Sequence, residues 1–506
     1  MRLVFKEVSN TSISRERFID FIKTLGLIML VFNSFFYLEF NFSGGEQFIF
    51  NNSDTSETYI VISWFTAGFA LFFFSMGFNN LIAWYSNVGR DGSQWNYLVD
   101  RINSILGPTI VWVITSSIFL NILVRTVTYP KFLTTSEDGL VSSIEFVLWP
   151  LWLVAIYLVL VLFAPLTIYL HKKYPYISLG ILVIITMFID AVNLPINFSY
   201  LKVLNYLFFW LTIHQFGYFY ADGKVQLINK NIFTFTSIIS FGYLFYKLSF
   251  SNEYLSMVSY RLTSISNEDP PTTLFLITSV GLISFFLSLR FKIENFFTND
   301  KKWLIFSHIH SNIYTLFFWH LVILFIVYLL GINNVYSPSL LLIIVLIFGN
   351  YERSVFKLST NLVKRVNPLQ PWPTPIKARI SISNFTLAWV SAFLILLGVV
   401  NVSLGGIGQD GFFSLREFYF IRSNTFEGLG RILIGLLLLN ITVRGLKYKK
   451  RILFLAIIFS IVALYSRILI SEPINNFEVA FTSLISMFFI ILLFLNSNYK
   501  FKSKVK

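Results

Sequence analysis

Long apolar runs recur along almost the whole chain, and they constrain its fold more than any other feature. Short polar loops separate the runs, and several runs are long enough to cross a hydrocarbon core of about 30 Å as a helix. Backbone polar groups in lipid must be satisfied within the segment, so such runs form helices. We therefore predict an all-α polytopic membrane protein with about fourteen helices.

The composition agrees with a membrane location. The 506 residues are 56% hydrophobic and only 13% charged, with a mean hydropathy of +0.70, which is unlike a soluble domain. The net charge of +14 is spread over short loops, so it indicates membrane orientation rather than a nucleic-acid partner. The chain has no cysteine, which excludes disulfides, a catalytic thiol and thiolate metal sites. The sequence makes no prediction about oligomeric state.

The apolar runs divide into a larger and a smaller set. The larger set predicts helices near residues 18–40, 58–84, 102–124, 147–169, 176–193, 200–220, 231–248, 272–290, 311–330 and 337–350. The smaller set predicts helices near residues 385–403, 427–443, 452–470 and 477–496. Loops rich in Lys and Arg alternate with neutral or acidic loops, and this alternation places both termini in the cytoplasm.

A basic, proline-rich stretch separates the two sets. It contains four closely spaced prolines, Pro368, Pro371, Pro373 and Pro375. Such a stretch is typical of a basic interfacial helix followed by a stiff linker. We therefore expect three parts. They are a ten-helix transmembrane core at 1–350, a cytoplasmic linker at 351–384 and a four-helix transmembrane appendix at 385–506.

The first predicted helix carries charge inside an otherwise apolar span. Asp20 and Lys23 lie about 60° apart on a helix, and Ser34 returns to within about 20° of the direction of Lys23. One polar stripe therefore runs from the membrane face to about mid-bilayer. Asp20 and Lys23 could pair at the helix mouth, with the lysine reaching lipid phosphates. Alternatively, the stripe faces a polar cavity inside the bundle.

Five histidines are further candidates for function: His171, His214, His308, His310 and His320. His171 lies in a basic loop and is expected to be solvated. His214 and His320 lie within predicted helices, where each suits either an interhelical hydrogen bond or a catalytic base. No pair has the i,i+4 spacing of helical metal ligands, so we predict no metal site. The sequence also lacks a phosphate-binding loop and a serine nucleophile elbow.

Five stretches, in order, resemble the membrane acyltransferase 3 family, and especially its actinobacterial-type branch. They are AGFALFFFSMGF at 67–78, YLVDRINSILGP at 97–108, PLWLVAIYLVLVLFAP at 150–165, LNYLFFWLTIHQFGYFYADG at 204–223 and NIYTLFFWHLVIL at 312–324. The resemblance extends from about residue 13 to residue 350, and the residues from 381 onward lie outside it. Arg101 in the second stretch stands at the arginine position of the family pattern.

The resemblance implies a multi-pass O-acyltransferase of the bacterial inner (plasma) membrane. Such an enzyme takes an acyl group, expected to be acetyl, from cytoplasmic acyl-CoA and places it on a hydroxyl of an extracytoplasmic glycan or lipid. The family's first helix carries an arginine and, eleven positions later, a histidine proposed as acid and base. Here Lys23 and Ser34 occupy those two positions. Serine cannot replace imidazole as a base at neutral pH.

This departure leaves two hypotheses open. In the first, the base comes from elsewhere, and the candidate catalytic residues are His320, His214, Ser34 and Asp20. The candidate residues for binding acyl-CoA, with acetyl-CoA as the expected donor, are Lys23, Arg101 and Arg17. In the second, the chain is a non-catalytic member that binds or translocates a lipid-linked saccharide.

Overall fold

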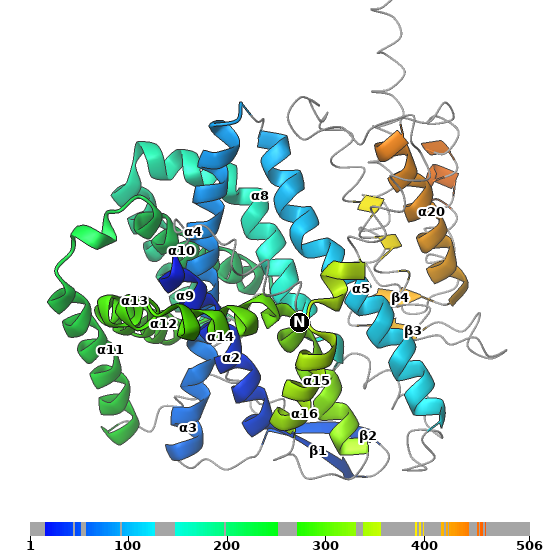
Figure 1. The fold of residues 1–506 in the computed structure, drawn as a ribbon, viewed down its shortest axis with the longest axis horizontal. Helices are drawn as coiled ribbons and strands as arrows, with labels where there is room; N and C mark the ends of the chain where they lie inside the picture. Colours follow the sequence, from blue (N-terminus) through cyan, green and yellow to red (C-terminus); the bar gives the residue numbers. More distant parts are fainter. Residues whose placement is uncertain are drawn as a thin grey trace, which may run out of the picture. The chain divides into compact units, whose positions relative to one another are not determined.

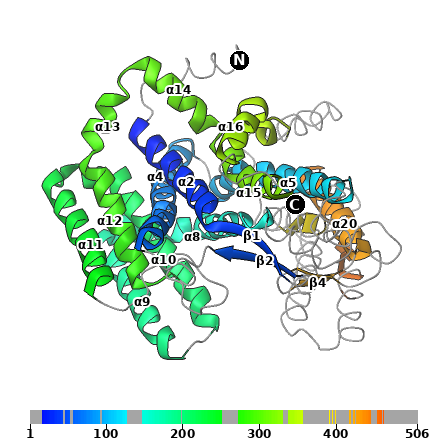
Figure 2. The same ribbon diagram turned by 90° about the horizontal axis from the view of Figure 1, so that it is seen from below.

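The computed structural model describes residues 16–43, 46–51, 57–91, 94–126, 147–196, 199–250, 271–329 and 337–355, together with scattered positions between 390 and 461. Its apolar segments are helical (Figures 1 and 2). The helices and 3-10 turns are α2 (Arg17–Tyr37), α3 (Glu57–Ser63), η1 (Trp64–Ala67), α4 (Gly68–Val88), α5 (Gln94–Thr126), α8 (Leu151–Lys173), α9 (Pro175–Ile196), α10 (Ser199–Ala221), η2 (Val225–Leu227), α11 (Lys230–Phe250), α12 (Thr273–Ser288), α13 (Arg290–Phe296), α14 (Asp300–Ser311), α15 (Ile313–Leu329), α16 (Ser337–Phe348) and α20 (Thr425–Arg444).

Among the described residues, 6 helices are long and apolar enough to cross a membrane. The number rises to 8 if each of two bent pairs counts as one span, α12 with α13 (53°) and α14 with α15 (54°). The chain is therefore a polytopic helical membrane protein, as predicted. The total of fourteen helices and the side on which the termini lie stay predictions.

Two short β-hairpins accompany the helices of the predicted all-α fold. Strand β1 (Leu38–Ser43) pairs antiparallel with β2 (Glu46–Asn51), and β3 (Arg416–Phe418) pairs with β4 (Ile421–Ser423). The first helix was expected to extend to residue 40, but the strand begins at residue 38. The sequence LEFNFS alternates apolar and polar residues, which is the two-residue period of a strand.

The segment between α12 and α15 is helical, although its charges led us to expect a loop there. It forms α13 and α14, which are missing from the predicted set. The side chain of Asn299 caps α14 by accepting from the backbone N–H groups of Lys301 (3.0 Å) and Lys302 (3.4 Å). Such a cap satisfies donors that the first turn of a helix cannot pair internally.

The chain divides into two compact units, residues 1–98 with 149–354 and residues 99–148 with 355–506. The first unit ends close to the predicted core boundary at 350, whereas most of α5 groups with the carboxy-terminal residues. Most of the predicted linker and the helix predicted at 477–496 lie outside the described residues. The helices predicted at 385–403 and 452–470 are described only at scattered positions, and α20 corresponds to the one predicted at 427–443.

Helix α4 is central to the packing of the first unit. Helix α2 packs against it, and the two lie side by side in both views (Figures 1 and 2). Gly26 of α2 and Gly68 of α4 allow the two backbones to touch, because a Cβ on Gly26 would lie 2.5 Å from the Gly68 carbonyl oxygen. Rings fill the space between α4 and α10, where Phe73 and Trp210 have centroids 4.5 Å apart. This packing fixes the position of α2 within the bundle.

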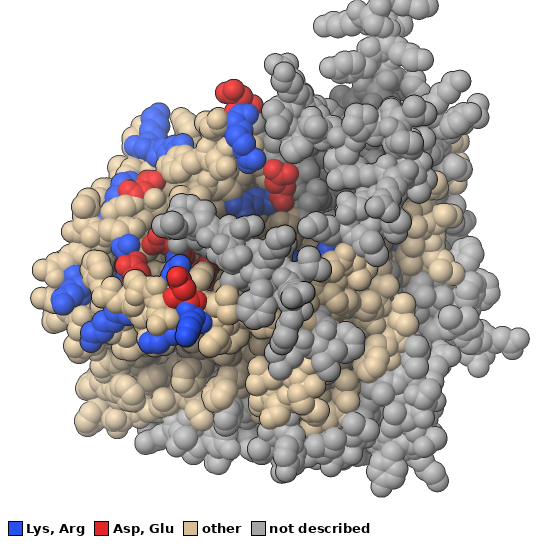
Figure 3. Space-filling view, viewed as in Figure 1, with Lys and Arg blue, Asp and Glu red and all other residues tan. Residues whose placement is uncertain are grey.

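Charged side chains of the described residues gather in the upper and middle parts of the left side in Figure 3, and the described surface below them is largely uncharged. The charges lie at helix ends and in the connections between helices, as at Arg90, Lys172, Lys224 and Lys302. A face rich in Lys and Arg is typical of the cytoplasmic side of a membrane protein.

Candidate acyl-transfer site

The polar stripe of α2 turns into the bundle at its first charge. The Oδ1 atom of Asp20 lies 3.4 Å from Nε2 of His310 on α14, and both side chains are nearly buried. Thr24, one turn further along α2, lies 2.7 Å from the other ring nitrogen of His310. This contact places the beginning of the stripe inside the bundle, and the polar cavity stays a prediction.

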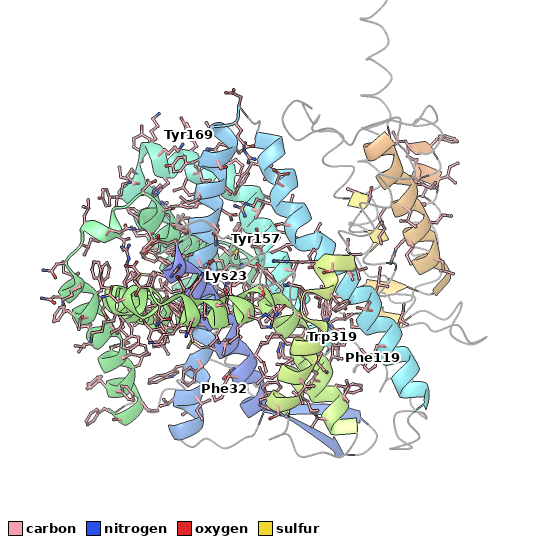
Figure 4. All side chains as sticks on the ribbon, in the orientation of Figure 1. Lys23, Phe32, Phe119, Tyr157, Tyr169 and Trp319 are labelled. Atoms are coloured by element: carbon pink, nitrogen blue, oxygen red, sulfur yellow. The ribbon has the colours of Figure 1, made fainter. Side chains whose placement is uncertain are left out.

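Lys23, the next charge of the stripe, lies over an aromatic ring. Its Nζ atom is 4.7 Å from the ring centroid of Tyr314 at the start of α15. Lys23 is half-buried and lies among the helices of the first unit (Figure 4). The guanidinium of Arg353, just after α16, is also 4.7 Å from the Tyr314 centroid. Two cations from distant parts of the chain therefore share one ring.

Arg17 lies at the same end of α2 but is held by other partners. It donates to the backbone carbonyl of Phe297 and lies 3.5 Å from the carboxylate of Asp300. Its guanidinium also stacks 5.0 Å from the ring of Trp303. These contacts tie the beginning of α2 to α13 and α14. Its predicted role in donor binding stays a prediction.

Ser34, at the far end of the stripe, is half-buried and donates to the backbone carbonyl of Leu30 at 3.1 Å. The neighbouring ring of Phe35 lies 6.4 Å from the imidazole of His320 on α15. His320 is therefore close to the deep end of the stripe, where the family pattern has a histidine on α2.

His320 is fully buried and is held by one of its two nitrogens. Its Nδ1 is hydrogen-bonded to the carbonyl oxygen of Phe317. Because a carbonyl only accepts, Nδ1 carries the proton, and neutral His320 keeps a lone pair on Nε2. That Nε2 atom is buried and makes no hydrogen bond to any described residue. The arrangement is suitable for accepting a proton from a bound molecule.

His214 resembles His320 in that one of its ring nitrogens, Nδ1, is buried and makes no hydrogen bond to any described residue. It is fully buried on α10, with Nε2 2.9 Å from the side-chain amide of Asn80 on α4. Its ring also contacts Tyr218 at 4.9 Å. The two candidate bases therefore lie on different helices, and the contact with Phe35 places His320 next to α2. Arg101 lies on α5, in the segment that belongs to the second unit.

His171 is not solvated, and the expectation from its basic loop was wrong. The imidazole is fully buried, with Nε2 3.1 Å from Oδ2 of Asp222. Asp222 also accepts a hydrogen bond from Tyr85 at 2.9 Å and lies 3.4 Å from Nζ of Lys224. The correction arises because α8 continues to Lys173, so His171 belongs to a helix that packs on α10.

Sequence reasoning missed Glu352, which lies just beyond α16. Its carboxylate is almost fully buried and accepts from the Thr315 hydroxyl (2.7 Å) and the Trp319 indole N–H (3.0 Å); Trp319 is labelled in Figure 4. Burial raises the pKa of Glu352, and these hydrogen bonds together with the charge of Arg353 oppose the shift. The sequence signal was an acid directly after an apolar run, hidden among the charges of the predicted linker.

These features define a helical membrane protein with a partly buried polar cluster between its first helix and α14 to α16. A family model for an acyltransferase domain matches residues 16–350, well over half of the chain. The chain therefore belongs to the acyltransferase 3 family, which confirms the resemblance. No curated protein and no solved structure matches the chain.

Proposed function

We propose that the chain is an O-acyltransferase that uses acyl-CoA, with acetyl-CoA as the expected donor. The proposed acceptor is a hydroxyl of an extracytoplasmic glycan or lipid-linked saccharide, and the proposed location is a bacterial inner membrane. Family membership supports membrane acyltransferase activity in general. The observation that carries the finer proposal is the buried, unbonded Nε2 of His320 next to the deep end of the α2 stripe.

In this proposal His320 is the general base. Its Nε2 takes the proton of the acceptor hydroxyl while the hydroxyl oxygen attacks the thioester carbonyl carbon. The carbon–sulfur bond then breaks, and the departing thiolate receives the proton from the imidazolium. The products are the acyl ester and free coenzyme A, so atoms and charge balance. The carbonyl of Phe317 keeps the proton on Nδ1 and so holds the tautomer that the step requires.

The test is acetyl-CoA cleavage by the purified full chain in nanodiscs, with water or a saccharide as acceptor. Because the chain has no cysteine, a thiol reagent reports released coenzyme A without protein background. His320→Gln should lower turnover about 100- to 10,000-fold. His308→Gln removes a half-buried imidazole on α14 and serves as the matched control, with turnover unchanged.

Three results would contradict the proposal. Unchanged turnover in a folded His320→Gln variant removes His320 from the reaction, and a loss confined to His214→Gln moves the base to α10. If the wild type binds a lipid-linked saccharide but releases no thiol with any hydroxyl acceptor, the non-catalytic alternative holds. The observation that favours this second candidate is the serine at the family's base position, Ser34, whose hydroxyl donates to the carbonyl of Leu30 in its own helix.

A further inference from the structure

Lys23 and Arg353 each lie 4.7 Å from the ring centroid of Tyr314, and the carboxylate of Glu352 acts electrostatically on Arg353. Within the described part of the chain, neither residue forms a direct ion pair. Two other cations of the same unit have carboxylate partners: Arg17 lies 3.5 Å from Asp300, and Arg290 lies 2.6 Å from Glu294. The pair at Tyr314 is therefore a local concentration of positive charge.

A bound anion would stabilise such an arrangement. A ring face attracts a cation, but two cations on one ring also repel each other, and Lys23 is half-buried. Glu352 is next to Arg353, yet both of its carboxylate oxygens accept hydrogen bonds from α15. A guanidinium fork and an ammonium point charge together suit a phosphate with several oxygens.

We propose that Lys23 and Arg353 form a phosphate-binding site over Tyr314, and that Glu352 is its positioning residue. The shared chemistry is a phosphate ester or pyrophosphate. Its source is a soluble acyl-CoA donor or a phospholipid headgroup. We assign the soluble donor, and this part of the inference rests on the proposed function.

The role of Glu352 follows from how the chain leaves α16. Asn350 has a left-handed backbone (φ 61°), and its N–H donates to the Thr315 hydroxyl at 3.1 Å. The same hydroxyl donates to Glu352, so the turn is bound to the first turns of α15. Tyr314 and Thr315 are neighbours on α15. The turn at Asn350 that positions Glu352 therefore also positions Arg353 at the ring of Tyr314.

The direct test measures binding to the full chain in nanodiscs of phosphatidylcholine alone. The probes are acetyl-CoA and inorganic pyrophosphate, measured by calorimetry. Lys23→Ala and Arg353→Ala should each weaken binding of both probes about 10-fold or more, and Arg353→Lys should weaken it less. Lys302→Ala is the matched control, because this lysine also lies over a ring, 4.1 Å from the centroid of Phe296, but is exposed. The Lys302→Ala variant should bind both probes as tightly as wild type.

A second arm separates the two phosphate sources. Nanodiscs containing phosphatidylglycerol are used to count lipids retained by each variant in native mass spectrometry. Loss of acetyl-CoA and pyrophosphate binding assigns the site to the soluble donor. Loss of retained phosphatidylglycerol alone assigns it to the headgroup and overturns the donor assignment. Unchanged binding of all three probes in folded Lys23→Ala and Arg353→Ala variants overturns the site.

Turnover distinguishes the site from the proposed reaction. Glu352→Gln should raise KM for acetyl-CoA several-fold with kcat unchanged, since a positioning residue affects donor binding and not the proton transfer. Glu352→Asp should recover part of the KM, and a fall in kcat alone would contradict positioning. Wild type that binds pyrophosphate but cleaves no thioester leaves the site intact and removes the proposed function. If Lys23→Ala instead shows normal turnover and unchanged binding, the phosphate-binding site is removed and the proposed function is kept.

Discussion

The Nε2 atom of His310 lies 3.4 Å from Oδ1 of Asp20, so a nearly buried contact between an imidazole and a carboxylate joins the first helix of the family domain to α14. Charge inside a membrane helix is costly unless it has a partner within the bundle. The partner here comes from a helix almost 300 residues further along the chain. The contact turns the polar stripe of α2 toward α14 and α15.

The first prediction concerns this pair. Asp20→Ala should lower the free energy of unfolding by about 1–3 kcal/mol, because it leaves His310 without its carboxylate in a nearly buried place. Asp300→Ala is the matched control. Asp300 also pairs with a cation across 3.5 Å, but its side chain is 92% exposed, so the loss should be about 0–1 kcal/mol. Thermal unfolding in detergent measures both, and equal losses would contradict the prediction.

The partner of Asp20 could not be predicted from the sequence. The helical spacing of Asp20, Lys23 and Ser34 correctly indicated a polar stripe within a membrane helix. The residues that the stripe contacts lie on α14. That segment was predicted to be a loop because of the charges of Lys301 and Lys302. The bend of 54° between α14 and α15 brings His310 and Tyr314 to the same end of α2. Such a bend is a tertiary feature without a local signal here.

The second prediction tests how α2 is held against α4. Gly26→Ala should destabilise the protein by about 1–3 kcal/mol, because the new Cβ would lie 2.5 Å from the carbonyl oxygen of Gly68 and 3.0 Å from the backbone nitrogen of Phe72. Backbone atoms cannot rotate aside as a flexible side chain can. Gly180→Ala on α9 meets nothing within 4 Å and should be neutral or stabilising by up to about 1 kcal/mol.

Melting temperatures of the two glycine variants in one detergent give the comparison. Destabilisation of similar size in both would show that the loss arises from the helix backbone and not from contact with α4. If Gly26→Ala is as stable as wild type, the close approach of α2 and α4 is wrong. Lys23 would then have no fixed position relative to the bundle.

The third prediction is the pH dependence that Glu352 produces. Burial raises its pKa above the usual 4.5, so the folded protein keeps this proton to a higher pH than the unfolded chain. Its contribution to stability is therefore fully present below about pH 4.5 and is lost as pH rises through the folded-state pKa. Glu352→Gln cannot titrate. The melting temperature of wild type minus that of Glu352→Gln should fall as pH rises from 4.5, and a constant difference would contradict the shift.

Arg353 and Glu352 show a second limit of the sequence. Both stand directly after an apolar run, and their position at the start of a proline-rich basic stretch favoured a solvated linker. In the structure, residues 351–355 are helical and the acid is buried against α15. By contrast, the family motif around Trp319 and His320 was recognisable from the sequence, because its residues are contiguous on one helix.

The last prediction restores the family's histidine. Among the residues that the structure describes, the hydroxyl of Ser34 is bonded only to Leu30 of its own helix, so its removal leaves none of their side chains unpaired. Ser34→His in a His320→Gln background should recover at least about tenfold of the lost acetyl-CoA cleavage, because an imidazole at this position can accept the acceptor's proton. Ser34→Asn in the same background is polar but cannot act as a base, and it should recover none.

Ser34→His in the wild type should change turnover little, because His320 already supplies the base. A folded double variant no more active than His320→Gln would mean that the acceptor hydroxyl does not reach this end of α2, and the polar stripe would then serve donor binding alone.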